Sequence, residues 1–175
     1  MQADEPGGVR RVLRVAGRYL LRVPLPLAML LVLLWGLLIW DLSSHAVPLP
    51  QGARLIWEFL SNLAHAPLFG FLTLFTAAVL LRERDGGWPR PRSGRSLLVL
   101  VCVLAYGALD ELHQSHTPGR DASPFDVLTD FVSALAVLWI VFILERRELK
   151  ERELVLRLLA GGLACCTSAA LALFS

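Results

Sequence analysis

The stretch Leu25–Trp40 reads LPLAMLLVLLWGLLIW and contains no charged side chain. A helix built from it is apolar on every face, whereas a helix on the surface of a soluble domain keeps a polar face. An apolar segment of roughly 20 residues is long enough to cross the hydrocarbon layer of a bilayer. The stretch therefore predicts a membrane-spanning helix.

Four further runs are mostly apolar, and they are Ala66–Leu81, the shorter Leu97–Leu109, Val127–Leu144 and Leu154–Phe174. Of the 175 residues, 55% are hydrophobic and only 18% are charged, and the mean hydropathy is +0.58. We predict an all-α fold, a polytopic membrane bundle of about five transmembrane helices. We divide the chain into a basic segment over residues 1–22, a transmembrane domain over residues 23–146, and a charged connector with a last span over residues 147–175.

The basic residues predict the orientation of the bundle. Of the 17 Lys and Arg residues, all except Arg54 and Arg120 lie before the first run, between the second and the third, or between the fourth run and the first turn of the fifth. If every run spans the membrane, these three groups lie on the same side. Lys and Arg are enriched in cytoplasmic loops, so we expect a cytoplasmic N-terminus and an external C-terminus. The net charge of +2 is thus a topology signal, and no motif indicates nucleic acid as a partner.

Two features near the first run allow alternatives. Basic residues before it and Ser44-His45-Ala46 after it resemble a secretory signal peptide. The run is long for such a peptide and contains Trp35 and Trp40, so we favour a retained span. Residues 1–9 are expected to form a disordered tail. The amphipathic stretch Ile56–Leu60 is expected to lie along the outer membrane interface.

The last run contains small residues at helical spacing. Gly161, Cys165 and Ala169 recur every four residues, and a second face repeats the pattern with Ala160, Ala164, Ser168 and Ala172. Such faces let helices approach closely. We interpret them as packing within the monomer, with a homo-oligomer through this face as the alternative. The three cysteines, Cys102, Cys165 and Cys166, all fall in predicted spans and are read as small apolar residues.

A dense polar stretch, DELHQSHTPGRDASPFDVLTD over residues 110–130, separates the third run from the fourth. Under the predicted topology it lies at the external membrane boundary, together with all four histidines, His45, His65, His113 and His116. Ionisable side chains are costly next to a bilayer, and they mark functional sites there.

Helical spacing predicts how these polar residues are arranged. Tyr106, Asp110 and His113 share one face of the third helix, and Gln114 follows Asp110 by four residues. On the fourth helix, Asp126, Asp130 and Ser133 line up in the same way, and His65 is expected to open the second helix just ahead of Pro67. If these faces converge, the bundle has a polar funnel that opens to the outside.

The polar stretch also carries an ordered motif. Asp110-Glu111-Leu112-His113-Gln114, then Thr117-Pro118-Gly119-Arg120, then Ser123 and Asp126 resemble the signature of the VanZ-like family of small membrane proteins. Ser43-Ser44 after the first run and His65 agree with this resemblance, which covers about Trp35 to Val141. It implies a location in the bacterial cytoplasmic membrane and a link to low-level resistance to antibiotics such as teicoplanin. An external signature would suit the outer leaflet, where such antibiotics insert and cell-wall precursors are displayed.

The chain departs from the family pattern at two places. Ser61-Asn62 stands where an Asp-Lys pair is expected, which removes a counter-charge for the external carboxylates. Asp130, followed by Ser133-Ala134, stands where the family has Asn followed by Gly-Ala.

Several residues have a structural alternative to a functional role. Ser123-Pro124-Phe125-Asp126 fits a helix start, so Asp126 is either a capping or a functional carboxylate. Arg120 suits an anionic headgroup or phosphate, or else a salt bridge to Glu111, Asp121 or Asp126. Glu111 and Gln114 have the strongest claim to function because neither is needed to turn or cap the chain. Asp130 lies deepest and is expected to be hydrogen-bonded or protonated.

Three hypotheses about function follow. The favoured one is an envelope protein that binds a lipid-linked cell-wall precursor or a glycopeptide antibiotic, in contact with membrane lipids. Its binding residues are His65, Tyr106, Asp110, Glu111, His113, Gln114, Arg120, Asp126 and Asp130. The second is a membrane enzyme acting on a lipid headgroup or cell-wall lipid, with the catalytic candidates Glu111 or Asp110 as base and Arg120 on the phosphate.

The third hypothesis is a metal site made of His65, Glu111, His113 and Asp126, although the chain has no compact ligand motif. A proton-coupled transporter is a weaker hypothesis still. It needs polar residues through the midplane of the membrane, and the inner halves of the predicted spans are apolar. We expect no cofactor, no metal and no established catalytic activity.

Overall fold

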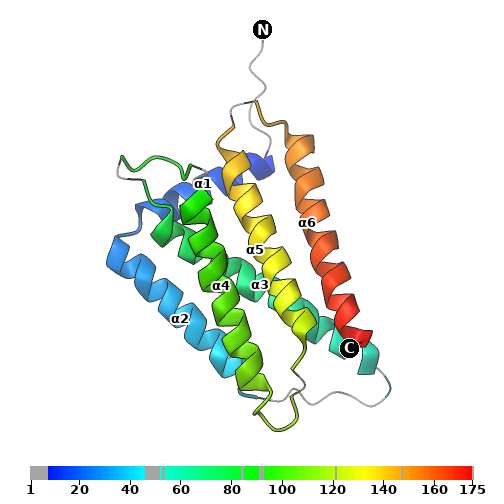
Figure 1. The fold of residues 1–175 in the computed structure, drawn as a ribbon. Coiled ribbons are helices and arrows are strands. Elements are labelled where there is room, and N and C mark those ends of the chain that lie inside the picture. The colour runs from blue at the N-terminus through cyan, green and yellow to red at the C-terminus, as the bar shows by residue number, and fades with distance from the viewer. Residues whose placement is uncertain are drawn as a thin grey trace.

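The computed structural model describes residues 8–45, 52, 54–83, 85–90, 93–120, 122–146 and 148–174. These residues form helices and no strand: α1 (Gly8–Arg22), α2 (Leu25–Ser43), α3 (Arg54–Leu80), α4 (Ser93–Gln114), α5 (Pro124–Leu144), α6 (Glu151–Leu171) and the short 3-10 turn η1 (Ala172–Phe174). Figure 1 shows them as one bundle. The predicted all-α bundle is confirmed.

The helices α2 to α6 are long and apolar enough to cross a membrane. The candidate spans within the described residues are Leu25–Ser43, Leu55–Leu80, Gly94–Gln114, Pro124–Leu144 and Glu151–Phe174. Each contains or overlaps one of the five apolar runs. The chain is therefore a multi-pass membrane protein, as predicted.

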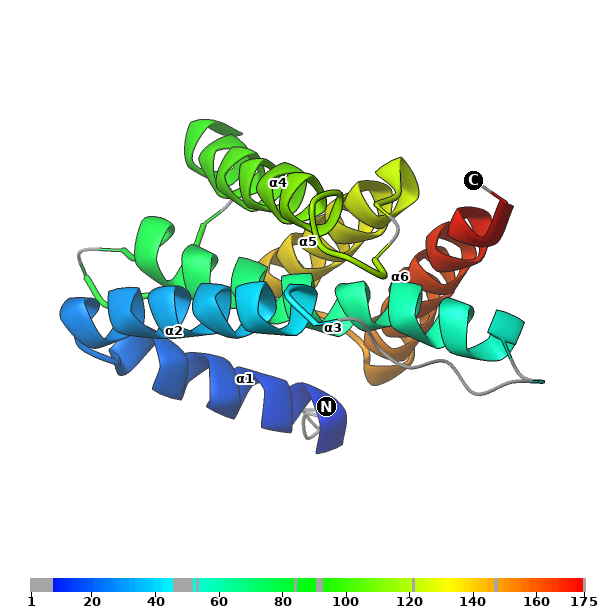
Figure 2. The same ribbon diagram turned by 90° about the horizontal axis from the view of Figure 1, so that it is seen from below.

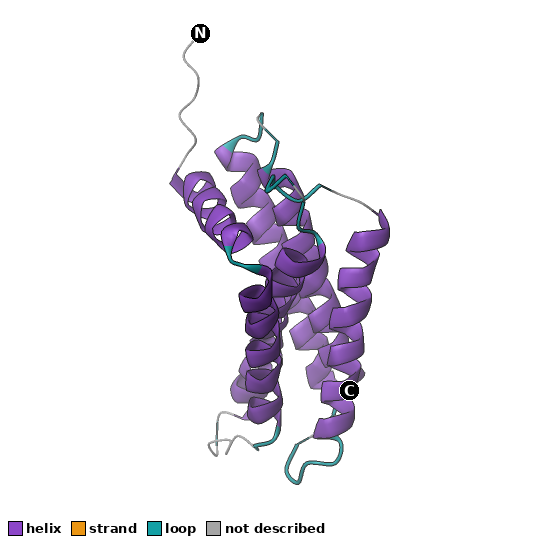
Figure 3. Ribbon diagram, turned by 90° about the vertical axis from the view of Figure 1, so that its left-hand side faces the viewer, coloured by secondary structure: helices purple, strands orange, loops and turns teal. Residues whose placement is uncertain are grey.

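The two ends of the bundle differ in their connections. In Figures 1 and 3, α1 and the connections α3–α4 and α5–α6 lie at one end, and the α4–α5 turn and the C-terminus lie at the other. The first end holds the described basic residues of all three groups, such as Arg14, Arg82 and Arg146. The charge rule assigns this end to the cytoplasm.

The helix α3 is the centre of the bundle. It packs against α2, α4, α5 and α6, and Figure 2 shows it crossing the width of the bundle. It runs without a break from Arg54 through Ile56–Leu60 and Pro67 to Leu80. One prediction is therefore wrong, because His65 lies inside a helix instead of opening one. Ile56–Leu60 forms the first part of α3, and its place at the membrane interface stays a prediction.

Contacts with neighbouring helices hold α3 on both sides of its proline. A proline inside a helix removes a backbone donor and clashes with the preceding turn, and in a membrane such a helix relies on its neighbours. Ser133 Oγ donates to the carbonyl of Ala66 (2.6 Å) and Trp35 Nε1 donates to that of Leu68 (2.8 Å). These bonds come from α5 and α2, which is why local sequence gave no sign of the continuous helix.

The core of the bundle is apolar and involves four helices. Ile39 of α2, Phe69 of α3, Val103 of α4 and Leu138 of α5 are at most 4% exposed and belong to one cluster. In α6, Gly161 faces Ala136 of α5, and Cys165 and Ala169 are buried. This face therefore packs within the monomer, and the homo-oligomer stays a prediction.

Arginines hold α1 against the end of the bundle that carries the α5–α6 connection. Arg14 Nε donates to the carbonyl of Leu144 (2.5 Å) and Arg10 Nη2 to that of Arg146 (2.7 Å), so α1 is bound to the C-terminal end of α5. Carbonyls at a helix C-terminus lack intrahelical partners and attract cations. Gly8 and Val9 already belong to α1, which shortens the predicted tail; residues 1–7 lie outside the described residues.

An apolar cavity of about 680 Å³ lies between α1, α3, α5 and α6. Its walls are almost entirely apolar and include Leu74, Trp88 and Ile140. At one side it reaches Ala66, next to His65, and Ser133, about one turn from Asp130.

Candidate functional site

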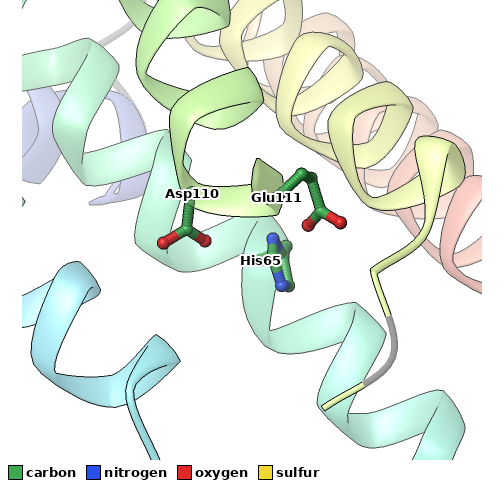
Figure 4. Close-up of side chains that lie close together, drawn as sticks. All are labelled: His65, Asp110 and Glu111. Carbon is green, nitrogen blue, oxygen red and sulfur yellow. The ribbon is translucent and has the colours of Figure 1, made fainter. Parts of the chain in front are cut away.

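Ionisable side chains from α3, α4 and α5 meet on the side of the core that faces the α4–α5 turn. Ligand atoms of His65, Asp110 and Glu111 all lie within 4.8 Å of one another, and Figure 4 shows the two carboxyl groups on either side of the imidazole. Asp130 of α5 approaches the same histidine, and Asp126 lies one turn earlier on that helix. We call these five residues, His65, Asp110, Glu111, Asp126 and Asp130, the acidic cluster.

The pair of His65 and Asp130 joins α3 to α5. Their atoms Nδ1 and Oδ1 lie 3.2 Å apart, and the two side chains are 12% and 0% exposed. The imidazole also stacks on Phe69, one turn along α3, with ring centroids 5.8 Å apart. The ring of His65 is thus fixed both by a hydrogen bond and by packing.

Gly107 allows α4 to come close to this pair. A Cβ at this position would lie 2.7 Å from Asp130 Oδ2 and 3.4 Å from the Phe69 ring. Any side chain would therefore push α4 away from the acidic cluster. The sequence did contain a signal: Gly107 precedes Asp110 and Glu111 by three and four residues and so shares their face of the helix.

Asp110 and Glu111 each use one oxygen for a bond within the protein. Gln114 Nε2 donates to Asp110 Oδ2 at 2.9 Å, and both side chains are buried. The backbone N–H of Ser123 donates to Glu111 Oε2 at 2.8 Å. The view that Glu111 has no structural task is therefore wrong, because its carboxylate accepts the backbone N–H of Ser123, the residue just before α5.

Ser123 caps α5, as predicted. Its hydroxyl accepts the N–H of Phe125, and Pro124 occupies the first position of the helix. Asp126 is 4% exposed and its Oδ1 has no hydrogen-bond partner among the described residues. Because the Ser123 hydroxyl provides the cap of α5, we count Asp126 with the acidic cluster and not as the capping residue.

The other oxygens of the acidic cluster are buried without a protein partner. They are Asp110 Oδ1, Glu111 Oε1, Asp126 Oδ1 and Asp130 Oδ2, within the part of the chain that the structure describes. Buried polar atoms almost always have a hydrogen-bond partner, and carboxylates close together in a low dielectric repel one another. The arrangement therefore suits a group that donates hydrogen bonds or carries positive charge.

Two other predicted site residues connect α4 to α2 and do not enter the acidic cluster. His113 stacks on Trp40, with ring centroids 3.9 Å apart, and its Nε2 lies 2.9 Å from Ser44 Oγ. Tyr106 donates its hydroxyl to the carbonyl of Gly36 at 2.5 Å. The signature Ser44 thus contacts a signature histidine.

Arg120 also binds α2. Its Nε donates to the carbonyl of His45 (2.9 Å) and its Nη2 to that of Leu42 (2.5 Å). These bonds hold the α4–α5 turn against the end of α2. Asp121, one of the salt-bridge partners considered for Arg120, lies outside the described residues.

Fold and site together define a multi-pass helical membrane protein with a buried cluster of four carboxylates and one imidazole at one side of its core. The family VanZ/LLP1 matches residues 25–145, more than half of the chain. The chain therefore belongs to this family, as its motif indicated. The matched region contains the whole acidic cluster. Searches of curated proteins and of solved structures found no match.

Proposed function

We propose that this chain is a protein of the bacterial cytoplasmic membrane that binds an amphipathic ligand at the acidic cluster, on the external side. Through this binding it contributes to teicoplanin-type resistance. The observation that carries the proposal is the set of four buried carboxylate oxygens that have no hydrogen-bond partner among the described residues. A ligand whose polar part donates hydrogen bonds, or carries positive charge, would satisfy them.

The apolar cavity supports a ligand with a lipid chain. Its lining includes Ala66, the sequence neighbour of His65, and Ser133, one turn from Asp130, and it continues between α3, α5 and α6. A ligand held at the acidic cluster by its polar part would have room there for an apolar chain. A lipid-linked cell-wall precursor and a lipid-bearing glycopeptide both have this character.

The enzyme alternative has less support. It assigns a phosphate to Arg120, but two nitrogens of that guanidinium donate to carbonyls of His45 and Leu42. The acidic cluster is rich in negative charge, which repels a bare phosphate. We therefore propose binding and advance no reaction.

The test is teicoplanin susceptibility of a sensitive Gram-positive host that produces the full chain. Glu111→Gln and Asp130→Asn remove charge but keep an oxygen that accepts the bonds from Ser123 and His65. Asp41→Asn is the matched control, because Asp41 is exposed at the same end of the bundle, outside the acidic cluster.

At matched membrane levels, wild type and Asp41→Asn should raise the inhibitory concentration, and the two cluster variants should not. Protection that survives both cluster changes would remove the acidic cluster from the function. A wild type that gives no protection would contradict the resistance role.

A further inference from the structure

We propose that His65, Asp110 and Glu111 bind one divalent transition-metal ion. These three side chains bring their ligand atoms within 4.8 Å of one another, on α3 and α4 (Figure 4). One imidazole and two carboxylates form a donor set that suits Zn²⁺ or Mn²⁺. The set considered from sequence contained His113 and Asp126 in place of Asp110. In the structure His113 stacks on Trp40 instead.

Each carboxylate ligand is oriented by one oxygen and presents the other. Gln114 donates to Asp110 Oδ2, and Asp110 Oδ1 is buried without a partner among the described residues. The Ser123 N–H donates to Glu111 Oε2, and Glu111 Oε1 is likewise buried without a partner. Asp110 is 1% and Glu111 9% exposed. Metal-ligating carboxylates in proteins are themselves hydrogen-bonded in this way.

The histidine follows the same pattern. Its Nδ1 lies 3.2 Å from Asp130 Oδ1, and in the neutral tautomer that donates Nδ1–H to this carboxylate the lone pair resides on Nε2. A histidine that binds a metal almost always donates its other ring N–H to a carboxylate, carbonyl or water, which fixes the tautomer and makes the ligand nitrogen more basic. Asp130 is thus a positioning residue for His65.

The distances require only small side-chain movements. Donor atoms around a metal at about 2.1 Å are roughly 3.4 Å apart in tetrahedral geometry. The three ligand atoms all lie within 4.8 Å of one another, and rotation of the carboxyl groups can bring them to the shorter tetrahedral spacing. The positive charge of the ion would also offset the mutual repulsion of the buried carboxylates.

A metal would change what the acidic cluster can bind. Three protein ligands leave coordination positions for an external oxygen, so the ion would accept an anionic group, such as a phosphate, that the carboxylates alone repel. This inference deepens the proposed function and rests on the acidic cluster being the binding site.

The test is the metal content of the full chain, purified in detergent with a tag free of histidine and without chelator. One sample is analysed directly, and others are stripped and reloaded with Zn²⁺ or Mn²⁺ alone. We expect about one ion per chain in the wild type. In Asp110→Asn, Glu111→Gln and His65→Ala, retention should be roughly a tenth or less. The exposed His116 gives the control His116→Gln, which should bind like the wild type.

Affinity supplies a second readout. Asp130→Asn should weaken metal binding by about 10- to 100-fold in competition with a chelator, because it replaces the carboxylate that accepts from the ligating histidine with a neutral amide. A wild type that binds neither ion after reloading overturns the inference, whatever the variants do. Equal binding by wild type and all cluster variants indicates an adventitious ion only and also overturns it. Loss of resistance in Glu111→Gln together with a metal-free wild type would leave the proposed function standing and reject the metal alone.

Discussion

At the scale of single residues, Gly107 determines how closely α4 approaches the acidic cluster. Gly107→Ala places a Cβ 2.7 Å from Asp130 Oδ2 and 3.4 Å from Phe69. Overpacking of this kind costs about 1–3 kcal/mol, so the free energy of unfolding should fall by that amount. Thermal unfolding in detergent measures it. Gly94→Ala, also on α4, meets nothing within 4 Å and should leave stability near the wild type; equal stability of both variants would contradict the close approach.

A substitution of Arg120 distinguishes a structural role of this residue from a role in ligand binding. Arg120→Ala removes two hydrogen bonds to the end of α2, which should lower the free energy of unfolding by about 1 kcal/mol. Because neither bond involves the acidic cluster, metal content should stay unchanged. Arg152→Ala, at an exposed position in α6, serves as the control for stability. An Arg120→Ala protein with normal stability but no bound ligand would instead favour a role on an anionic group.

Which residues enter the acidic cluster was only partly predictable. The spacing of Asp110, Gln114, Asp126 and Asp130 correctly indicated polar helix faces, because that spacing is local. His113 also follows Asp110 by three residues, yet it lies on Trp40. The rotation of α4 between α2 and α5 decides which neighbour each side chain meets, and local periodicity does not contain that rotation.

At the scale of elements, α3 depends on donors from its neighbours. Ser133→Ala removes the bond to the Ala66 carbonyl and should cost about 0.5–2 kcal/mol. Thr167→Ala is a suitable comparison, because Thr167 is exposed and its hydroxyl donates to a carbonyl of its own helix. Thermal unfolding of the two variants should differ clearly; a stable Ser133→Ala protein would mean that α3 does not need this bond.

The five spans could be predicted because each contains a long apolar run, although the run Leu97–Leu109 reaches the length of a span only together with its flanking residues in Gly94–Gln114. The start of α3 could not, since Pro67 is a typical signal for a helix start and Ile56–Leu60 is amphipathic. The helix continues across Pro67 with contacts from residues distant in the sequence, Trp35 and Ser133.

At the scale of the whole molecule, the charge pattern predicts which end faces outward. In a variant without its three native cysteines, Ser115→Cys adds a thiol to the α4–α5 turn and Glu148→Cys adds one to the α5–α6 connection; both positions are exposed. A membrane-impermeant maleimide should label the first in intact cells and the second only after permeabilisation. The reverse labelling would place the acidic cluster on the cytoplasmic side and exclude an external ligand.

The central claim is that the acidic cluster binds a ligand, and equilibrium binding of teicoplanin to the purified full chain tests it most directly. The account predicts saturable binding by wild type and Asp41→Asn, weakened by at least about tenfold in Glu111→Gln, which corresponds to about 1.4 kcal/mol. Binding of equal strength in wild type and Glu111→Gln, or no saturable binding at all, would contradict it.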